Sequence, residues 1–476
     1  MKKPFLFLFF CLAILYSLGA QDLRERILFD EDWRFAFGNA SSPEKDFGCG
    51  TEYFNYLTKA ASIHNEGPYS DKFDASGWKR VDLPHDWVVD LPFDGKASHS
   101  HGYKTVGYRY PETSVGWYRK TFSIPQADLG RHISIRFDGI FRDARVWVNG
   151  FYLGHEPSGY ATQEYDITDY LNYGGENLVC VRVDATLEEG WFYEGAGIYR
   201  HVWLNKMDKL HVAPFGTFVH SALEAPFDKA ALTVETTVKN SSEQSMSYTL
   251  RHILRDADGR EVARCEVDGT RLLPRENGRT VGSMEINNPH LWSTETPYLY
   301  KVETEVYCEG RLTDTYTTTT GIRHMAFDAD RGFLLNGQPL KLKGVNMHQD
   351  HPGVGSGIPD ALQAYRIREL KKLGCNAYRA SHNPMTPEML DVCDREGILV
   401  IEENRLTGIN QEHIGLLRRM IERDRNHPSL LIWTPTNEEF WPDRIQYPRL
   451  MHDLYNLTKM IDPTRPFHGA SGGVHI

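Results

Sequence analysis

Hydrophobic and polar residues alternate along short segments in the first part of the chain. The segments Ile133–Phe137 and Ala144–Val148 place apolar side chains at every second position, which is the period of a β-strand with one buried face. Asn149-Gly150 follows the second segment and is typical of a tight hairpin turn. The pattern predicts a β-sandwich over residues 21–205, with residues 90–115 as a long loop inside it.

A second group of strand-like segments follows. Its clearest members are Leu232–Val238, Ser247–Leu250 and Tyr298–Val306, and polar turn residues separate them. This spacing predicts another, smaller sandwich over residues 206–322.

The pattern changes after Arg323, where strand-like and helix-like segments alternate. The expected strands are Leu340–His348, Cys375–Ser381, Ile398–Glu403, Ser429–Thr434 and a fifth at Arg465–Ala470; the expected helices are Asp360–Leu373, Pro387–Glu396, Gln411–Arg425 and Pro448–Ile461. Such alternation predicts a parallel sheet built from βα units over residues 323–476. It fits either an open doubly wound sheet or the first half of an eight-stranded barrel. No glycine-rich phosphate loop follows the first strand, which favours the barrel.

Charge and composition exclude some classes of function. The net charge is −11, and no cluster of lysine and arginine provides a surface for nucleic acid. A mildly acidic protein suits a neutral substrate. After the N-terminus no apolar run approaches the roughly 18–20 residues of a membrane-spanning helix, so we expect no membrane span.

The N-terminus resembles a secretory signal peptide. Lys2 and Lys3 precede an apolar run from Phe5 to Leu18, and small residues follow at Gly19-Ala20. We expect residues 1–20 to be removed by cleavage near Ala20, which predicts a secreted or periplasmic protein. The remaining cysteines show no zinc-binding spacing; Cys375 and Cys393 are expected to be buried thiols.

Chemically versatile residues follow each of the first four strands of the βα region. A barrel places its active site at the carboxyl ends of its strands, so these residues are expected to meet at one site. The four groups are Asn346–His351, Arg379–Asn383, Glu402–Arg405 and Asn437-Glu438.

Three kinds of hydrolytic chemistry use residues of these types. The segment Gly469–Gly473 matches the pattern of a nucleophilic serine, but no helix follows it in the sequence. His348, Asp350, His351 and His382 could hold a metal, but they lack the helical spacing of a metal-dependent hydrolase. Glycosidic cleavage fits best: Glu438 would donate a proton, Asn437 would bind a sugar hydroxyl, and His348 and His382 would bind others. Trp433 lies within a strand and is expected in the core.

Several segments together resemble glycoside hydrolase family 2, and within it the exported bacterial β-galactosidases. The segments that resemble its barrel are Gly332–Gly337, Lys343–Pro352, Asn376–Pro384 and Arg425–Trp433 running into Asn437-Glu438; those that resemble its sugar-binding sandwich are Gly116–Phe122, Val146–Gly150 and Gly195–Arg200. The resemblance implies an N-terminal jelly-roll-like β-sandwich, an immunoglobulin-like β-sandwich and then the first half of a (β/α)8 TIM barrel.

The resemblance also implies an activity and roles for the site residues. It implies a retaining exo-β-glycosidase, foremost a β-galactosidase, that removes terminal β-linked sugars from carbohydrates; β-glucuronidase and β-mannosidase are the alternatives within the family. Glu438 would be the acid/base and Asn437 the partner of the 2-hydroxyl, while His348, His382 and Asn383 would bind the sugar. Arg379 would orient carboxylates at the pocket floor. No cofactor is expected.

Three departures from the family pattern matter. The magnesium ligands of some members would fall within 403–408, and this segment does not reproduce them, so no metal is expected. Pro435 and Thr436 replace the usual residues before Asn437 and affect the aim of Glu438. The nucleophilic glutamate would lie roughly 90 residues beyond Glu438, past Ile476. The sequence thus predicts a fragment of the full enzyme, an enzyme completed by another chain, or a catalytically inactive carbohydrate-binding protein. It leaves the oligomeric state open.

Overall fold

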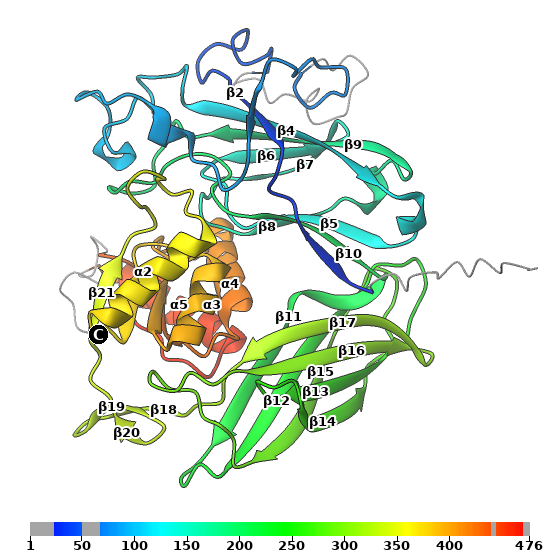
Figure 1. The fold of residues 1–476 in the computed structure, drawn as a ribbon, viewed down its shortest axis with the longest axis vertical. Coiled ribbons are helices and arrows are strands. Elements are labelled where there is room, and N and C mark those ends of the chain that lie inside the picture. Colours follow the sequence, from blue (N-terminus) through cyan, green and yellow to red (C-terminus); the bar gives the residue numbers. More distant parts are fainter. Residues whose placement is uncertain (1–22, 50–66, 439–443, 470–476) are drawn as a thin grey trace, which may run out of the picture.

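The computed structural model describes residues 23–49, 67–438 and 444–469. Three parts follow one another along the chain (Figure 1). The N-terminal sandwich, in blue and cyan, lies at the top of the view, and a second sandwich, in green, lies below it. A sheet covered by helices, in yellow to red, lies beside both of them. The proposed signal peptide lies outside the described residues.

The first sandwich consists of two antiparallel sheets. One has the order β3-β2-β4-β9-β6-β7 and the other β1-β10-β5-β8. Apolar residues from both inner faces, such as Phe137, Val181 and Leu204, form one core. The strands are β1 Glu25–Leu28, β2 Trp33–Phe37, β3 Lys79–Val81, β4 Val115–Ile124, β5 His132–Phe137, β6 Ala144–Val148, β7 Phe151–Glu156, β8 Gln163–Asp166, β9 Gly175–Asp184 and β10 Val202–Met207.

The hairpin turn predicted at Asn149-Gly150 joins β6 to β7. Asn149 has φ 49° and Gly150 has φ 82°, the left-handed pair that a tight β-hairpin requires. The long loop predicted at residues 90–115 contains the 3-10 helix η3 His99–His101. The other described 3-10 helices are η2 Trp87–Asp90, η4 Gln126–Asp128 and η5 Thr168–Tyr170.

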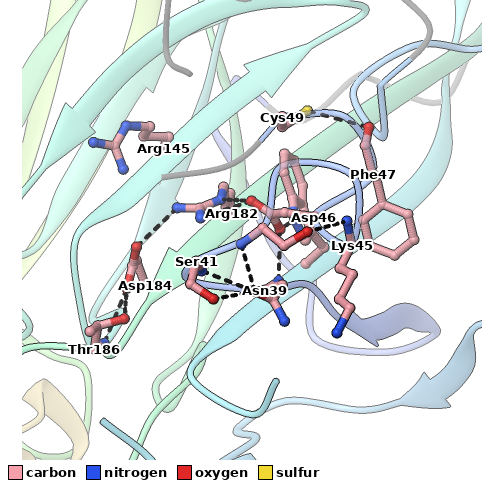
Figure 2. Close-up of polar contacts among 12 residues, drawn as sticks. Asn39, Ser41, Lys45, Asp46, Phe47, Cys49, Arg145, Arg182, Asp184 and Thr186 are labelled. Atoms are coloured by element: carbon pink, nitrogen blue, oxygen red, sulfur yellow. Dashed lines mark hydrogen bonds and ion pairs between the residues drawn. The ribbon is translucent and has the colours of Figure 1, made fainter. Parts of the chain in front are cut away.

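A buried ion pair attaches the loop after β2 to the outer face of the larger sheet (Figure 2). Arg182 on β9 donates to Asp46 through Nε at 2.9 Å, and both side chains are fully buried. The other carboxylate oxygen of Asp46 accepts the indole N–H of Trp117 at 2.7 Å. Asp184 approaches Arg182 Nη1 at 3.3 Å. The charges therefore compensate one another inside an aromatic cluster that includes Trp117 and Trp147.

The second sandwich pairs the sheets β11-β12-β15 and β14-β13-β16-β17. Burial alternates along β12, where Leu232, Val234 and Val238 point into the core, because successive strand side chains face opposite sides of a sheet. The strands are β11 Leu210–Leu223, β12 Lys229–Asn240, β13 Thr249–Arg255, β14 Glu261–Asp268, β15 Asn277–Asn287, β16 Tyr300–Cys308 and β17 Arg311–Thr320.

A small antiparallel sheet leads into the βα region, whose strands are parallel in the order β21-β22-β23-β24. Side chains from the strands and helices form its core, and Trp433 is completely buried there, as predicted. The strands are β18 Met325–Asp328, β19 Gly332–Leu335, β20 Gln338–Pro339, β21 Gly344–Met347, β22 Ala377–Ala380, β23 Leu399–Glu403 and β24 Leu430–Thr434; the helices are α2 Asp360–Lys372, α3 Pro387–Glu396, α4 Gln411–Asp424 and α5 Gln446–Ile461. The predicted fold class, two sandwiches followed by part of a TIM barrel, is confirmed.

Local signals explain the helix ends. The hydroxyl of Thr386 caps α3 by accepting the N–H of Met389 at 3.2 Å, Pro387 opens the helix, and Gly397 ends it with φ 71°. Asn410 caps α4 in the same way through the N–H of His413 at 3.0 Å. These capping residues are visible in the sequence, which is why the predicted bounds of α3 agree with the structure.

Three local predictions need correction. The strand expected at Leu340–His348 is shorter: only Gly344–Met347 joins the parallel sheet, because the chain before it pairs with β19 as far as Pro339 and residues 340–343 connect the two sheets. Cys375 is only partly buried because it lies in the connection before β22, whereas Cys393 is buried as expected. The fifth strand is represented by a single parallel bridge between Trp433 and Phe467, and Ala470 lies outside the described residues. Among the described helices, none is both long and apolar enough to cross a membrane.

Candidate active site

The ends of β21 to β24 bring the predicted site residues to one edge of the parallel sheet. His348 follows β21, His382 follows β22, Glu403 ends β23, and Asn437-Glu438 follow β24. Because parallel strands carry their carboxyl ends to the same side, residues up to 90 positions apart meet there.

Glu403 lies at the centre of this group. Its buried carboxylate accepts the N–H of His382 Nδ1 at 2.8 Å on one oxygen and pairs with Arg379 through the other. Since the carboxylate holds the proton on Nδ1, Nε2 of a neutral His382 is left as an acceptor. The sequence placed Glu403 in one of the four strand-end groups but indicated no particular role for it. Its place at a strand end was the available signal, but its partners come from a different strand.

Arg379 also fixes the orientation of Asn437. Its Nη2 donates to Oδ1 of Asn437 at 2.6 Å, and because a guanidinium can only donate, the amide nitrogen must face the other way. Asn437 is 4% exposed, and its Nδ2 has no hydrogen-bond partner among the residues that the structure describes. A buried donor without a partner is costly, so Nδ2 is suited to donate to a ligand hydroxyl.

Glu438 follows immediately and is exposed. Its backbone is left-handed, with φ 48°, a conformation that non-glycine residues seldom adopt outside turns and functional sites. At this turn the chain passes from the buried Asn437 to the exposed Glu438. The carboxyl group of Glu438 is therefore open to the solvent, on the residue next to the Asn437 that Arg379 orients. Residues 439–443 lie outside the described residues.

His348 and His382 lie against each other and against an aromatic ring of the first sandwich. The two imidazoles meet edge to face at 5.1 Å, and Phe192 lies 4.8 Å from His348 and 5.6 Å from His382. Burial, with the nearby His382, lowers the pKa of His348, which favours a neutral ring whose buried Nδ1 has no partner. A neutral imidazole can exchange hydrogen bonds with sugar hydroxyls.

Asn383 is 4% exposed and lines a small cavity beside His382 and Phe192. Its backbone carbonyl accepts Gln349 Nε2 at 2.6 Å, and Arg200 of the first sandwich donates to Gln349 Oε1 at 2.7 Å. The structure therefore gives Asn383 a place in the contact between the two domains as well as beside the predicted sugar ligands.

The first sandwich forms one wall of the site through residues 187–194, hereafter the wall loop. Tyr193 donates to the buried carboxylate of Asp86 at 2.8 Å, and that carboxylate also accepts the backbone N–H of Ser356 in the barrel region at 2.9 Å. The sequence indicated no role for Phe192, Tyr193 or Asp86 at this site. The run of aromatic and acidic residues just before Gly195 was a signal for Phe192 and Tyr193, whereas Asp86 lies more than 100 positions earlier and only the fold brings it here.

Glu402 is not available for this site. Its carboxyl group is fully buried and accepts the N–H of Met385 at 2.7 Å. Burial, with added repulsion from Asp424, raises its pKa to about 8. It therefore lies on the core side of β23, while its neighbour Glu403 faces the strand ends.

The segment 403–408 does not fit a magnesium ion. Glu403 is committed to Arg379 and His382, and the amide nitrogen of Asn404 lies 3.5 Å from the carbonyl of Leu406. The next residue is the cation Arg405. A divalent metal needs several free oxygen ligands, and this donor set does not provide them.

Another cavity lies away from this site. It has a volume of about 750 Å³ and lies between the second sandwich and the start of the barrel region, where Leu223, Arg323 and Pro428 line it. These residues precede the parallel strands, and that end of a barrel usually serves stability.

Comparison with known proteins agrees with this geometry. Three models of one family match: the sugar-binding domain of glycosyl hydrolases family 2 at residues 104–208, the family 2 domain at 211–323, and its TIM barrel domain at 329–415 and 409–475. The chain belongs to glycosyl hydrolases family 2.

Related proteins include two different glycosidases. The chain is 37% identical to β-galactosidase BoGH2A of Bacteroides ovatus, over 88% of this chain and 47% of that protein. It is 32% identical to a putative β-glucuronidase of Formosa agariphila, over 84% of this chain and 38% of that protein. A solved family 2 member from Bacteroides cellulosilyticus superimposes with a TM-score of 0.83 at 32% identity, covering 94% of this chain and 56% of the other. This family 2 chain spans about half the length of the curated relatives it matches.

Proposed function

We propose that this family 2 chain supplies the acid/base half of a retaining exo-β-glycosidase, with Glu438 as the proton donor. The observation that carries the proposal is the arrangement around Asn437. Arg379 donates to Oδ1 of Asn437 at 2.6 Å, and this leaves Nδ2 without a partner among the described residues, on the residue that precedes the exposed Glu438.

Each residue of the site has its own role in glycosidic cleavage. Glu438 protonates the departing glycosidic oxygen and later removes a proton from the water that completes hydrolysis. Asn437 Nδ2 donates to the hydroxyl beside the reacting carbon, and His348 and His382 bind other hydroxyls of the same sugar. Asn383 shapes the pocket beside them.

A retaining mechanism needs a second carboxylate about 5–5.5 Å from the acid/base. Glu402 is buried on the core side, and the carboxylate of Glu403 already binds Arg379 and His382. We therefore propose that the nucleophile comes from protein outside these 476 residues, either from a continuation of the reading frame or from a second chain.

For the substrate we propose a terminal β-linked galactoside. The relative with 37% identity is named a β-galactosidase. A terminal β-glucuronide is the second candidate, because relatives at 32% and 27% identity are named as β-glucuronidases.

Hydrolysis and binding should be measured together. The 476-residue chain and the protein from the complete reading frame would each be tested on nitrophenyl β-galactoside and β-glucuronide, with galactose binding followed by calorimetry. We expect turnover only when the second carboxylate is present, and a loss of at least 100-fold in Glu438→Gln. Unchanged turnover in Glu438→Gln rejects the role of Glu438. Galactose binding by both proteins without turnover in either of them supports the catalytically inactive carbohydrate-binding alternative.

We also propose that the protein is exported to the periplasm or the medium. The charged start and short apolar run of the first twenty residues support this. N-terminal sequencing of the protein recovered from its native cells should begin just after Ala20; a retained Met1 contradicts export by this route.

A further inference from the structure

We propose that Arg405 and Trp191 form a second sugar position, next to the pocket for the terminal sugar, and that this position binds a sugar carrying a negative charge. The inference rests on the proposed glycosidase function and specifies the class of substrate: a terminal galactoside attached to an acidic neighbour, either a uronic acid or a sulfated sugar.

The two side chains come from different domains and stack on each other. The guanidinium carbon of Arg405, two residues after β23, lies 4.2 Å from the centre of the Trp191 ring in the wall loop. Trp191 is 41% exposed. Flat aromatic rings stack on the apolar faces of sugars, and a cation on one face of the ring fixes its orientation.

Arg405 forms no ion pair with any acidic side chain of the described residues. Within the described part of the chain, its polar contact is a hydrogen bond from Nη1 to the carbonyl of Glu189, and its buried Nε has no partner. By contrast, Arg379 pairs with Glu403, and Arg142 lies 3.0 Å from Glu189. A guanidinium without a carboxylate partner is a ready site for a carboxylate or sulfate of a ligand.

The wall loop holds Trp191 firmly. The carbonyl of Gly190 accepts the hydroxyl of Ser100 at 2.5 Å, and the N–H of Glu189 donates to the buried Glu194 carboxyl at 2.9 Å. A sugar platform that is fixed before binding loses little entropy when the ligand arrives.

Phe192 connects this position to the proposed pocket. Its ring contacts His348 and His382, and it also lies 5.8 Å from the guanidinium of Arg405. One sugar ring spans about this distance. A disaccharide whose terminal sugar contacts His348 and His382 would thus place its next sugar beside Arg405 and Trp191. The overall charge of −11 disfavours acidic ligands in general, so any preference for them must arise locally.

The test measures binding of four probes to the 476-residue chain by calorimetry: galactose, lactose, lactobionate, and lactose sulfated on its glucose ring. Lactobionate supplies a carboxylate and sulfated lactose a sulfate at the second position. We expect at least one acidic probe to bind about tenfold more tightly than lactose, as one charge-assisted contact provides. The better probe identifies the charged group.

Variants show which side chain causes the preference for acidic probes. In Arg405→Met the acidic probe should bind no better than lactose, whereas Arg405→Lys should keep part of the preference. Trp191→Ala should weaken lactose and sulfated lactose alike, because both offer a glucose ring for stacking, and should weaken the open-chain end of lactobionate less. Arg331→Met, which removes an exposed arginine in the turn between β18 and β19, is the matched control and should bind all probes as the unmodified chain does. Raising the salt concentration should reduce the preference in the unmodified chain.

The outcomes separate the two proposals. Equal affinity of the unmodified chain for lactose and both acidic probes overturns this inference and leaves the galactosidase proposal intact, as does a preference that survives Arg405→Met. If galactose and all three disaccharides fail to bind, the galactoside proposal falls and this inference falls with it.

Discussion

Arg379 donates to the carboxamide oxygen of Asn437 at 2.6 Å, across 58 positions of the sequence. The contact joins two neighbouring functions at the strand ends, since Arg379 also pairs with Glu403. One guanidinium therefore sets the direction of a neutral donor and neutralises a buried carboxylate. Because an arginine accepts no hydrogen bond, the arrangement leaves a single orientation for Asn437.

Asn437→Asp tests this orientation. The substitution keeps an oxygen for Arg379, replaces the NH2 donor by a second oxygen and adds a negative charge that Arg379 can pair with. We therefore expect the protein to remain folded while galactose affinity falls about tenfold, the value of one hydrogen bond to a ligand. Calorimetry gives the affinity and thermal unfolding gives the stability. An affinity equal to that of the unmodified chain excludes Nδ2 as a sugar donor.

The adjacent glutamates of β23 provide a matched pair for stability. Glu403→Gln leaves Arg379 without its buried counter-charge, and we expect a loss of about 3–5 kcal/mol in the free energy of unfolding. Glu402→Gln should cost less than about 1 kcal/mol at pH 7, because burial raises the pKa of Glu402 to about 8 and the carboxyl is already protonated. Urea unfolding measures both; equal losses in the two variants refute the distinction.

The raised pKa of Glu402 predicts that the stability of the protein depends on pH. A carboxyl whose pKa is raised by folding stabilises the protein most below its ordinary pKa, and this contribution disappears as the pH rises through the raised value. The unmodified chain should therefore lose stability through Glu402 between about pH 4.5 and 8, and Glu402→Gln should not. At pH 9 the variant is expected to be the more stable protein in thermal unfolding.

His201 connects the first sandwich to the barrel region through charge. Its Nε2 donates to Asp360 at 3.0 Å, Nδ1 donates to Asp30, and Glu388 and Asp138 are the other acidic groups nearby. Burial opposes protonation, but the hydrogen bonds to Asp30 and Asp360 outweigh it and raise the pKa of His201 to about 10.

His201→Gln should therefore destabilise the protein in a pH-dependent manner. The stabilisation from a raised histidine pKa is complete below the unfolded value of about 6.5 and is lost as the pH rises to about 10. We expect a cost of about 1–3 kcal/mol at pH 6 and little cost above pH 10. His452→Gln, on a side chain that is 72% exposed, is the control. A difference that is constant from pH 6 to 10 rules out this linkage.

Asp46→Asn tests the buried pair of the first sandwich shown in Figure 2. Removing the carboxylate takes from the buried Arg182 its partner at 2.9 Å and leaves Asp184, at 3.3 Å, as a more distant counter-charge, and we expect a loss of about 3 kcal/mol. The exposed Asp330→Asn serves as the control, with a change below about 0.5 kcal/mol. Denaturant unfolding followed by tryptophan fluorescence is suitable because Trp117 donates to Asp46. Equal stability of the two variants contradicts a structural role for the pair.

The sequence by itself determined the order of the three parts and many of their elements. The alternation of apolar and polar residues predicted strands in both sandwiches, and Thr386, Pro387 and Gly397 defined α3, because strand period and helix caps depend on residues close in the chain. The residues after β21 to β24 were also identified in this way, since the ends of parallel strands fall on one side of the sheet.

Tertiary structure alone decided which of these residues work together. Glu403 and Glu402 are neighbours of the same chemical type, yet one faces Arg379 and His382 and the other faces the core. The contacts of Phe192 with His348, and of Trp191 with Arg405, join residues separated by more than 150 positions and by a whole domain. No local period encodes such contacts, because they depend on how the packed domains are oriented toward one another.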